Sequence, residues 1–388
     1  MLRGVVDPEL GADLVDLGMV RDVEAGTDGS VAVTVALTVA GCPLRNQIRR
    51  DVESKVQSLA GVTGVEVRTG EMTSEERSAV MAKARWKARE RAGSDRLSPS
   101  TRVVAVASGK GGVGKSSVTV NLAVSLARKG LSVGLLDADI WGFSVPRMLG
   151  LEDRLEAEGT AEDWAIVPSS RPVGAGRLEV VSMGLLAAGE GDAIMWRGLL
   201  LNRALQHFIE DVRWGPLDYL VIDMPPGTGD IQMGLARMLP RTEVLIVTTP
   251  PLAAAKVAAR AADMARKGWL RVAGVVENMS AFTCEHGTSY ALFGSGGGQL
   301  LADEIGVPLV GSIPFDPAVA VGGDAGEPAA LQDGGPVAAA FGAVADRLVS
   351  EIVPVVEMSG CTARLLDRVN AALDDAALDD ASPPVAAG

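Results

Sequence analysis

Residues 109–116 read Gly-Lys-Gly-Gly-Val-Gly-Lys-Ser, a glycine-rich loop of the kind that holds phosphate groups. Glycines at this spacing let backbone N–H groups turn toward the phosphates, while a lysine neutralises their charge and a hydroxyl holds Mg²⁺. Lys115 and Ser116 occupy the lysine and hydroxyl positions. The loop therefore predicts a nucleoside triphosphate site formed by Gly109, Lys110, Gly111, Gly112, Val113, Gly114, Lys115, Ser116 and Ser117.

A second lysine, Lys110, stands at the start of this loop. From that position its side chain reaches the phosphates of its own loop poorly, whereas a second copy of the chain can receive it. We therefore expect an ATPase that completes its site by dimerising.

The segments on either side of the loop support a phosphate site. Residues 103–107 are a short apolar run with β-branched residues, typical of a buried parallel strand. Val118, Leu122 and Leu126 then recur every four residues before Gly130, as in a helix. This order places the phosphates at a helix N-terminus, where the helix dipole favours anions.

Two aspartates follow apolar strands farther along the chain. Asp139, after the strand at 132–136, is predicted to orient the attacking water, although a turn or cap aspartate is the alternative. Asp223 ends the strand at 219–223, the place from which Mg²⁺ is held in such enzymes. Gly227 is suited to contact the γ-phosphate and to move when that phosphate leaves. The predicted catalytic residues are Lys110, Lys115, Asp139 and Asp223, and the predicted Mg²⁺ ligands are Ser116 and Asp223.

Composition narrows the class of protein. A chain of 388 residues with 47% hydrophobic content predicts two or three domains with substantial cores. A net charge of −13 argues against a general nucleic-acid or anionic-membrane binder. The first eight residues lack the apolar core of a signal peptide, and no stretch reaches about 18 uninterrupted apolar residues, so we expect neither a secretory leader nor a membrane span. Three cysteines do not make a disulfide framework, so we expect free thiols in a reducing cytoplasm.

The hydrophobic patterns divide the chain into a small α+β domain at 1–73 and an ATPase domain at 99–350. In the first, Val31 to Val39 alternate as in a half-buried strand, and Leu44, Ile48 and Val52 mark one face of a helix. In the second, strands alternate with helices, which predicts an α/β fold with a doubly wound, mostly parallel sheet. The expected strands are 103–107, 132–136, 178–182, 219–223, 243–248, 272–276 and 308–313, with helices at 197–213, 251–267 and 336–352.

Two further segments have unusual charge. The connector at 74–98 carries seven Lys or Arg residues and four acids between 74 and 96, with a capping box at Thr73 and Glu76. A solvated linker helix is favoured over a nucleic-acid patch. The tail at 351–388 has seven acids against Arg364 and Arg368, and we expect it to be partly disordered. Its acidity argues against a membrane-seeking role.

With these motifs in view, residues from about 102 to 330 resemble the Mrp/ApbC-type iron–sulfur cluster carriers, within the MinD/ParA class of dimeric ATPases. Residues 1–73 resemble the small cluster-assembly domain that often precedes them, through Asp7-Pro-Glu-Leu10 and Thr38-x-x-x-Cys42-Pro43. The other matching segments are 107–116, 136–142, 223–230, Glu277-Asn-Met-Ser280, 293–298 and 322–326.

The resemblance implies a homodimeric, Mg²⁺-dependent ATPase that receives iron–sulfur clusters from cluster donors and passes them to apo-proteins. It implies that Lys110 reaches the partner's nucleotide and that Asp139 and Asp223 serve the water and the metal. It also implies that Asn278 hydrogen-bonds adenine, with Pro314 and Asp316 near the base, so that ATP is the nucleotide. Neither a membrane nor a nucleic acid is expected as a partner.

The cluster site departs from the family pattern. The family has Cys-x-x-Cys after the Glu-Asn-Met-Ser segment, whereas Cys284 is followed here by Glu285, His286 and Gly287. Two chains would then supply two thiolates where a cluster needs four ligands. His286, an exogenous thiol or a client protein would have to complete the set. Cys284 is the iron-binding candidate, and an inert, partly buried thiol is the alternative.

Cys42 is a second thiol of interest. Because Pro43 suits the first position of a helix, Cys42 is predicted at the N-cap, where the helix dipole favours a reactive thiolate. An ordinary small apolar residue is the equal alternative. Cys361 gives no signal of its own.

Two other functions stay open at this point. The missing second cysteine favours a MinD/ParA-like switch that positions a partner or cargo without a metal cluster. A reductase like the nitrogenase iron protein is disfavoured because the ATPase domain has one suitable cysteine.

Overall fold

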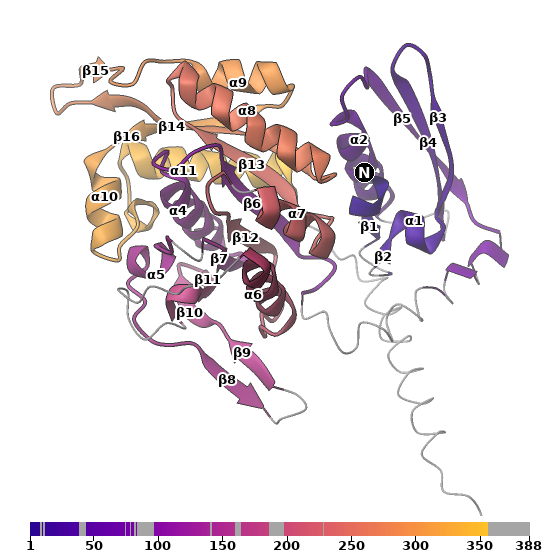
Figure 1. Cartoon of the computed structure of the whole chain (residues 1–388), viewed down its shortest axis with the longest axis horizontal. Helices are drawn as coiled ribbons and strands as arrows, with labels where there is room; N and C mark the ends of the chain where they lie inside the picture. The colour runs from indigo at the N-terminus through magenta and orange to yellow at the C-terminus, as the bar shows by residue number, and fades with distance from the viewer. Residues whose placement is uncertain are drawn as a thin grey trace, which may run out of the picture.

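The computed structural model of the chain describes residues 1–355, apart from 8–9, 11, 39–43, 74, 78, 81–82, 84–96, 140–141, 160–163, 186–197 and 228. Figure 1 shows a small N-terminal domain beside a larger domain built on a broad sheet.

The N-terminal domain is a three-stranded sheet covered by one long helix. Strand β4 (Ser30–Leu37) pairs antiparallel with β3 (Val20–Ala25) and parallel with β5 (Gly64–Glu71). Helix α2 (Arg45–Gln57) makes the crossover between β4 and β5 and packs Ile48, Val52 and Val56 against them. The short elements η1 (Leu2–Gly4), β1 (Val6–Asp7), β2 (Ala12–Asp13) and α1 (Leu14–Leu17) precede this sheet.

The predicted start of α2 is wrong. The helix begins at Arg45 with Leu44 at its N-cap, so Cys42 is not the capping residue. Cys42 itself lies outside the described residues. Helix ends are defined only to within one or two residues, and whether the Cys42 thiol feels the helix dipole stays a prediction.

The larger domain is doubly wound around a nine-stranded sheet. From one edge the strands run β10, β11, β7, β12, β6, β13 and β14, with β16 beyond β14 and β15 at its tip. Across the sheet, every pairing from β11 through β7, β12, β6, β13 and β14 to β16 is parallel. Strand β10 pairs antiparallel with β11, and β15 pairs antiparallel with the end of β14. The strands are β6 (Arg102–Ser108), β7 (Ser132–Asp137), β10 (Ser169–Val173), β11 (Gly176–Ser182), β12 (Tyr219–Asp223), β13 (Glu243–Thr248), β14 (Arg271–Thr283), β15 (Ser289–Tyr290) and β16 (Leu309–Phe315).

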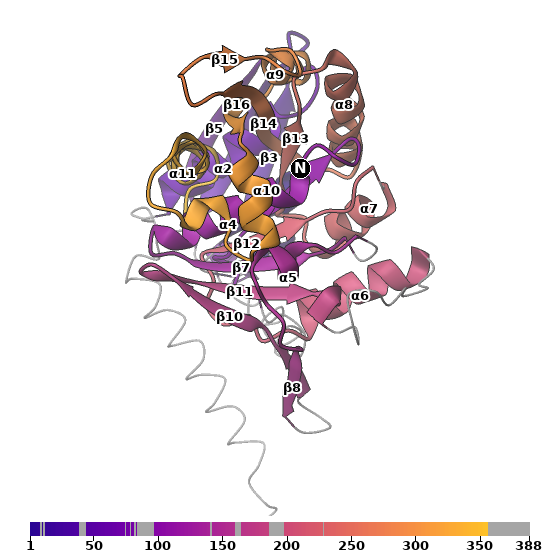
Figure 2. The ribbon, with the colours of Figure 1, turned by 90° about the vertical axis from the view of Figure 1, so that its left-hand side faces the viewer.

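Helices cover both faces of this sheet (Figure 2). One apolar core lies between the sheet and α4 (Lys115–Arg128) with α11 (Pro336–Arg347). The other lies under α6 (Gly198–Glu210), α7 (Gly229–Met238), α8 (Leu252–Lys267) and α9 (Gly297–Ile305). Because both faces are covered, every residue of β12 and β13 is buried, which explains their unbroken apolar runs. The expected doubly wound α/β fold is confirmed.

The structure also contains elements that the patterns did not predict. A hairpin of β8 (Glu156–Gly159) and β9 (Trp164–Val167), the short helices α5 (Val145–Met148) and α10 (Pro317–Asp324), and the edge strand β10 carry no long apolar run. Strand β14 continues well past the predicted end at 276, because its last residues leave the core and pair with β15.

The capping box at the start of the connector is confirmed. The backbone N–H of Thr73 donates to Glu76 Oε2 at 2.7 Å, and the backbone N–H of Glu76 donates to Thr73 Oγ1 at 3.1 Å. The tail from residue 356 and most of the connector lie outside the described residues. Within the described part of the chain, no helix is both long and apolar enough to cross a membrane.

Candidate functional site

The phosphate loop joins β6 to α4 at the carboxyl edge of the sheet. Gly114 needs to be glycine, because its φ is +78° and an added Cβ would lie 2.3 Å from Asn278 Nδ2. At Gly109 an added Cβ would lie 2.3 Å from the backbone of Val257 on α8. The loop is therefore fixed between α8 on one side and β14 on the other.

Lys115, Ser116 and Asp223 form a compact cluster below this loop. Lys115 Nζ lies 2.7 Å from Asp223 Oδ1, and Ser116 Oγ donates to Asp223 Oδ2 at 2.6 Å. The Lys115 side chain is 6% exposed and that of Asp223 is fully buried. A hydroxyl and a carboxylate on adjacent elements are the hard oxygen donors that Mg²⁺ prefers. The two predicted Mg²⁺ ligands are thus brought together.

A second carboxyl group lies beside Asp223. Asp137 ends β7 in direct register with Asp223 on β12, and its side chain is completely buried. Burial and then repulsion by Asp223 raise the pKa of Asp137 to about 7, although Lys115 opposes this. Asp137 accepts hydrogen bonds from the N–H of Asp139 at 3.1 Å and from Ser182 Oγ at 3.1 Å.

Asp139 lies just beyond β7 on the loop over this cluster. Its carboxylate accepts a hydrogen bond from the N–H of Gly142 at 3.2 Å, so it caps a turn, as in the alternative interpretation of this residue. Partial burial raises its pKa, with Lys115 opposing and Asp223 adding to the shift. Asp139 is therefore within electrostatic range of both site residues.

Lys110 differs from Lys115 in its surroundings. Its side chain is exposed, and it makes no ion pair with any described residue, whereas its carbonyl oxygen accepts from Ser108 Oγ at 3.1 Å. Gly227 lies next to the same loop, and its N–H donates to the carbonyl of Ser108 at 3.4 Å. Lys110, within the phosphate loop, and Gly227, beside it, are therefore both exposed at the surface.

The predicted adenine residues lie on β14, on β16 and just after β16. Asn278 is buried and pairs in register with Ile313, the residue before Pro314. Asn278 Nδ2 donates to the carbonyl of Val113 in the phosphate loop at 2.9 Å. Asp316 caps α10 by accepting from the N–H of Ala318 at 2.9 Å.

Cys284 lies in the turn of the β14–β15 hairpin. Its N–H donates to the carbonyl of Thr288, and the N–H of Gly287 donates back to the carbonyl of Cys284. Hydrogen bonds with the backbone of His286 and then of Thr288 lower the pKa of the Cys284 thiol. Gly287 has a φ of +79°, a backbone conformation that residues with a side chain rarely adopt. His286 is 81% exposed.

One chain does not supply a complete metal site in the part that the structure describes. There, no three His, Cys, Asp or Glu side chains are grouped to hold an ion. Cys42 and Cys361 lie outside that part.

Three residues of the cluster around Asp223 were missed from sequence. Thr119 Oγ1 donates to Asp223 Oδ1 at 2.8 Å, one turn after Lys115 on α4. Asp137 and Ser182 complete the buried network. The Asp-x-Asp spacing at 137–139 was the available signal, because it places the first carboxyl inside the sheet.

Comparison with known proteins agrees with this geometry. Residues 100–349 match the family described as NUBPL iron-transfer P-loop NTPase, and residues 1–67 match the family described as iron-sulfur cluster assembly protein. The iron-sulfur cluster carrier protein of Mycobacterium tuberculosis is 46% identical over 340 residues, covering 85% of this chain and 86% of the relative. That of Deinococcus radiodurans is 45% identical over 355 residues, covering 90% and 93%.

A solved structure is also similar. The nucleotide-binding protein from Archaeoglobus fulgidus, in complex with ADP, is 34% identical, covers 62% of this chain and 91% of its own, and has a TM-score of 0.50. The carrier names of the relatives do not favour a metal-free switch. The chain therefore belongs to the NUBPL iron-transfer P-loop NTPase family: it is an ATPase and an iron–sulfur cluster carrier.

Proposed function

We propose that this chain binds Mg-ATP at the loop 109–116, holds an iron–sulfur cluster at Cys284 together with a second copy, and delivers it to apo-proteins. The observation that carries the proposal is the path of β14. Asn278 on this strand donates to Val113 in the phosphate loop, and the same strand continues to Thr283, the residue before Cys284. One element thus contacts the nucleotide loop and leads to the thiol.

In this proposal the ion pair between Lys115 and Asp223 joins the phosphate loop to the end of β12 within the nucleotide site. A triphosphate would draw Lys115 to its oxygens, and Ser116 and Asp223 would then hold Mg²⁺. Held by Ser116 and Asp223, Mg²⁺ would supply positive charge against the phosphate oxygens. Asp139 orients that water, and Lys110 reaches the nucleotide of the partner chain.

ATP is the proposed nucleotide. Asn278 lies between the phosphate loop and β16, so a small shift of its amide would let it bond the base near Pro314 and Asp316. The ADP in the Archaeoglobus fulgidus relative supports an adenine nucleotide.

The cluster is cargo that needs ligands from more than one chain. Cys284 from two copies supplies two thiolates, and a cluster needs four ligands. The exposed His286 of each copy, an exogenous thiol or the client protein completes the set. This incomplete set suits a carrier, because the client protein can supply the ligands that the two Cys284 thiolates leave open.

We further infer a cytoplasmic homodimer that works with cluster donors and apo iron–sulfur proteins, without a membrane or nucleic acid as partner. The net charge of −13 supports the last point.

Anaerobic reconstitution with iron and sulfide tests the proposal. The wild type should gain a charge-transfer absorbance and bound iron, and Cys284→Ala should lose most of both. Cys361→Ala is the matched control and should retain them. Equal iron in wild type and Cys284→Ala would overturn the assignment of the cargo site.

A further inference from the structure

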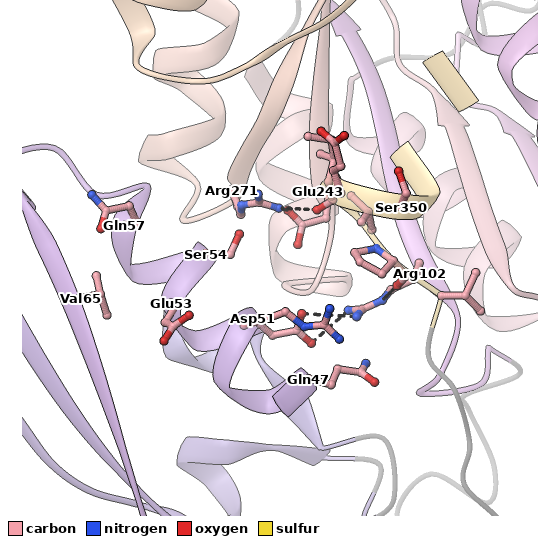
Figure 3. Close-up of a pocket in the computed structure, with 16 residues that line it drawn as sticks. Gln47, Asp51, Glu53, Ser54, Gln57, Val65, Arg102, Glu243, Arg271 and Ser350 are labelled. Atoms are coloured by element: carbon pink, nitrogen blue, oxygen red, sulfur yellow. Dashed lines mark hydrogen bonds and ion pairs between the residues drawn. The ribbon is translucent and has the colours of Figure 1, made fainter. Parts of the chain in front are cut away.

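The two domains meet through charged side chains at the edge of the sheet where β6, β13 and β14 begin (Figure 3). Asp51 and Lys55 lie one turn apart on α2 of the N-terminal domain. Arg102 donates two hydrogen bonds to the Asp51 carboxylate, from Nη1 to Oδ2 at 3.2 Å and from Nη2 to Oδ1 at 3.3 Å. Lys55 Nζ lies 3.1 Å from Glu243 Oε1. Opposite charges therefore alternate across the contact.

The pair formed by Lys55 and Glu243 is buried. The two side chains are 4% and 10% exposed, and Arg271 Nη1 donates to the second Glu243 oxygen at 3.0 Å. Burial alone would raise the pKa of Glu243, but attraction by Lys55 and then Arg271 outweighs burial and lowers it. Lys55 and Arg271 together therefore favour the charged form of Glu243 inside the contact.

The receiving surface is held in shape by the ATPase domain itself. Arg102 Nε donates to the carbonyl of Pro354 at 2.7 Å, and Arg271 Nη1 donates to the carbonyl of Ile352 at 3.3 Å. Both arginines are therefore positioned by the end of their own domain.

The contact is ionic and incompletely packed. In the described residues, the apolar core of the N-terminal domain contains no residue of the ATPase domain. A pocket of about 440 Å³ lies between α2 and the residues Arg102, Glu243 and Arg271. Polar interfaces between domains behave like transient protein interfaces and permit relative motion.

This contact is remote from the proposed cargo site. Arg271 begins β14, and Cys284 follows the end of that strand. At about 3.3 Å per residue, a strand of this length spans roughly 40 Å. Figure 1 shows the β15 hairpin and the N-terminal domain at opposite ends of the molecule.

We propose that the edge formed by Arg102, Glu243 and Arg271 is a releasable docking surface for the chain's own N-terminal domain. The domain leaves this surface before it exchanges a cluster with Cys284 of the same chain. The second statement rests on the proposed function, whereas the first rests on the contact alone.

The test uses the full chain without iron or nucleotide. Lys55→Glu and Asp51→Arg each place like charges in contact, and we expect a larger radius of gyration by small-angle X-ray scattering. Hydrogen exchange of peptides covering 45–57 and 240–245 should accelerate about tenfold or more, because removing one partner of a buried ion pair is strongly unfavourable.

Matched variants distinguish release of the N-terminal domain from its unfolding. Arg49→Glu makes the same charge change as Lys55→Glu at an exposed pair on the same helix, and should leave both readouts unchanged. Exchange in β5 (64–71) should also stay slow. The double variant Asp51→Arg/Arg102→Asp should return toward the wild type.

Three results would overturn the proposal: wild-type dimensions in both Lys55→Glu and Asp51→Arg, equal expansion in Arg49→Glu, or fast exchange of β5 whenever α2 is exposed. Neither readout involves iron, so a failure to bind a cluster leaves this test intact.

Discussion

Asp137 and Asp223 end neighbouring parallel strands in direct register, and both carboxyl groups are fully buried. Lys115 pairs with Asp223 at 2.7 Å and also attracts the neighbouring Asp137, so one lysine offsets the charge of two adjacent acids. Two adjacent buried acids therefore face one buried cation in this site.

Asp137→Asn should change how stability depends on pH. The folded-state pKa of Asp137 is raised from 3.8 to about 7, so the folded chain keeps a proton in that window that the unfolded chain has lost. The contribution of this proton to the free energy of unfolding is fully present below about pH 4 and is lost as the pH rises toward 7. The variant should lack this loss, which amounts to a few kcal/mol at about 1.4 kcal/mol per pKa unit.

Urea unfolding followed at several values between pH 4 and 8 measures the effect. Asp333→Asn, at a side chain that is 94% exposed, is the control and should follow the wild type. Parallel pH curves for wild type and Asp137→Asn would show that the carboxyl is ionised throughout.

Lys115→Ala should abolish nucleotide binding and also weaken the fold. The change leaves buried Asp223 without its cation, which costs about 3–5 kcal/mol for a buried pair. Titration with a fluorescent ATP analogue and urea unfolding report the two losses. Lys129→Ala alters an exposed ion pair just past the far end of α4 and should affect neither. Wild-type affinity in Lys115→Ala would contradict the assigned role.

Lys110→Ala should leave nucleotide affinity within about twofold and lower ATP hydrolysis at least tenfold, since a cation supplied in trans acts mainly in the transition state. The exposed side chain makes no ion pair among described residues, so stability should not change.

Mixing variants tests whether Lys110 acts across a dimer. A chain with Lys110→Ala keeps its own Asp139, and a chain with Asp139→Ala keeps its Lys110. Their mixture should regain hydrolysis because one of the two sites is then complete. Activity no higher than that of either variant alone would place the lysine in its own site.

Gly287→Cys should increase retention of the cluster. It supplies the second thiolate that the family pattern contains, and no atom lies within 4 Å of the added Cβ. The φ of +79° should cost about 1–2 kcal/mol of stability. Gly287→Ser carries the same strain without a thiol. After reconstitution, a chelator should remove iron several-fold more slowly from Gly287→Cys than from either wild type or Gly287→Ser.

The sheet and the phosphate loop were predictable because they depend on local patterns. Apolar runs such as 219–222 and 244–247 follow from burial on both faces of the sheet. The hairpin that presents Cys284 was not predictable, because β14 leaves the core there and alternation is lost. The role of Asp137 depends on register with β12, which no single segment encodes. The same limit applies to Lys55 and Glu243, which are far apart in sequence and meet only through domain docking.

We propose that two chains share one cluster through Cys284. Anaerobic native mass spectrometry of the reconstituted protein, with and without Mg-ATP, tests it most directly. We predict that iron and sulfide mass is found on species of two chains and is absent from Cys284→Ala. A cluster carried by single chains, or by pairs of Cys284→Ala chains, would contradict the account.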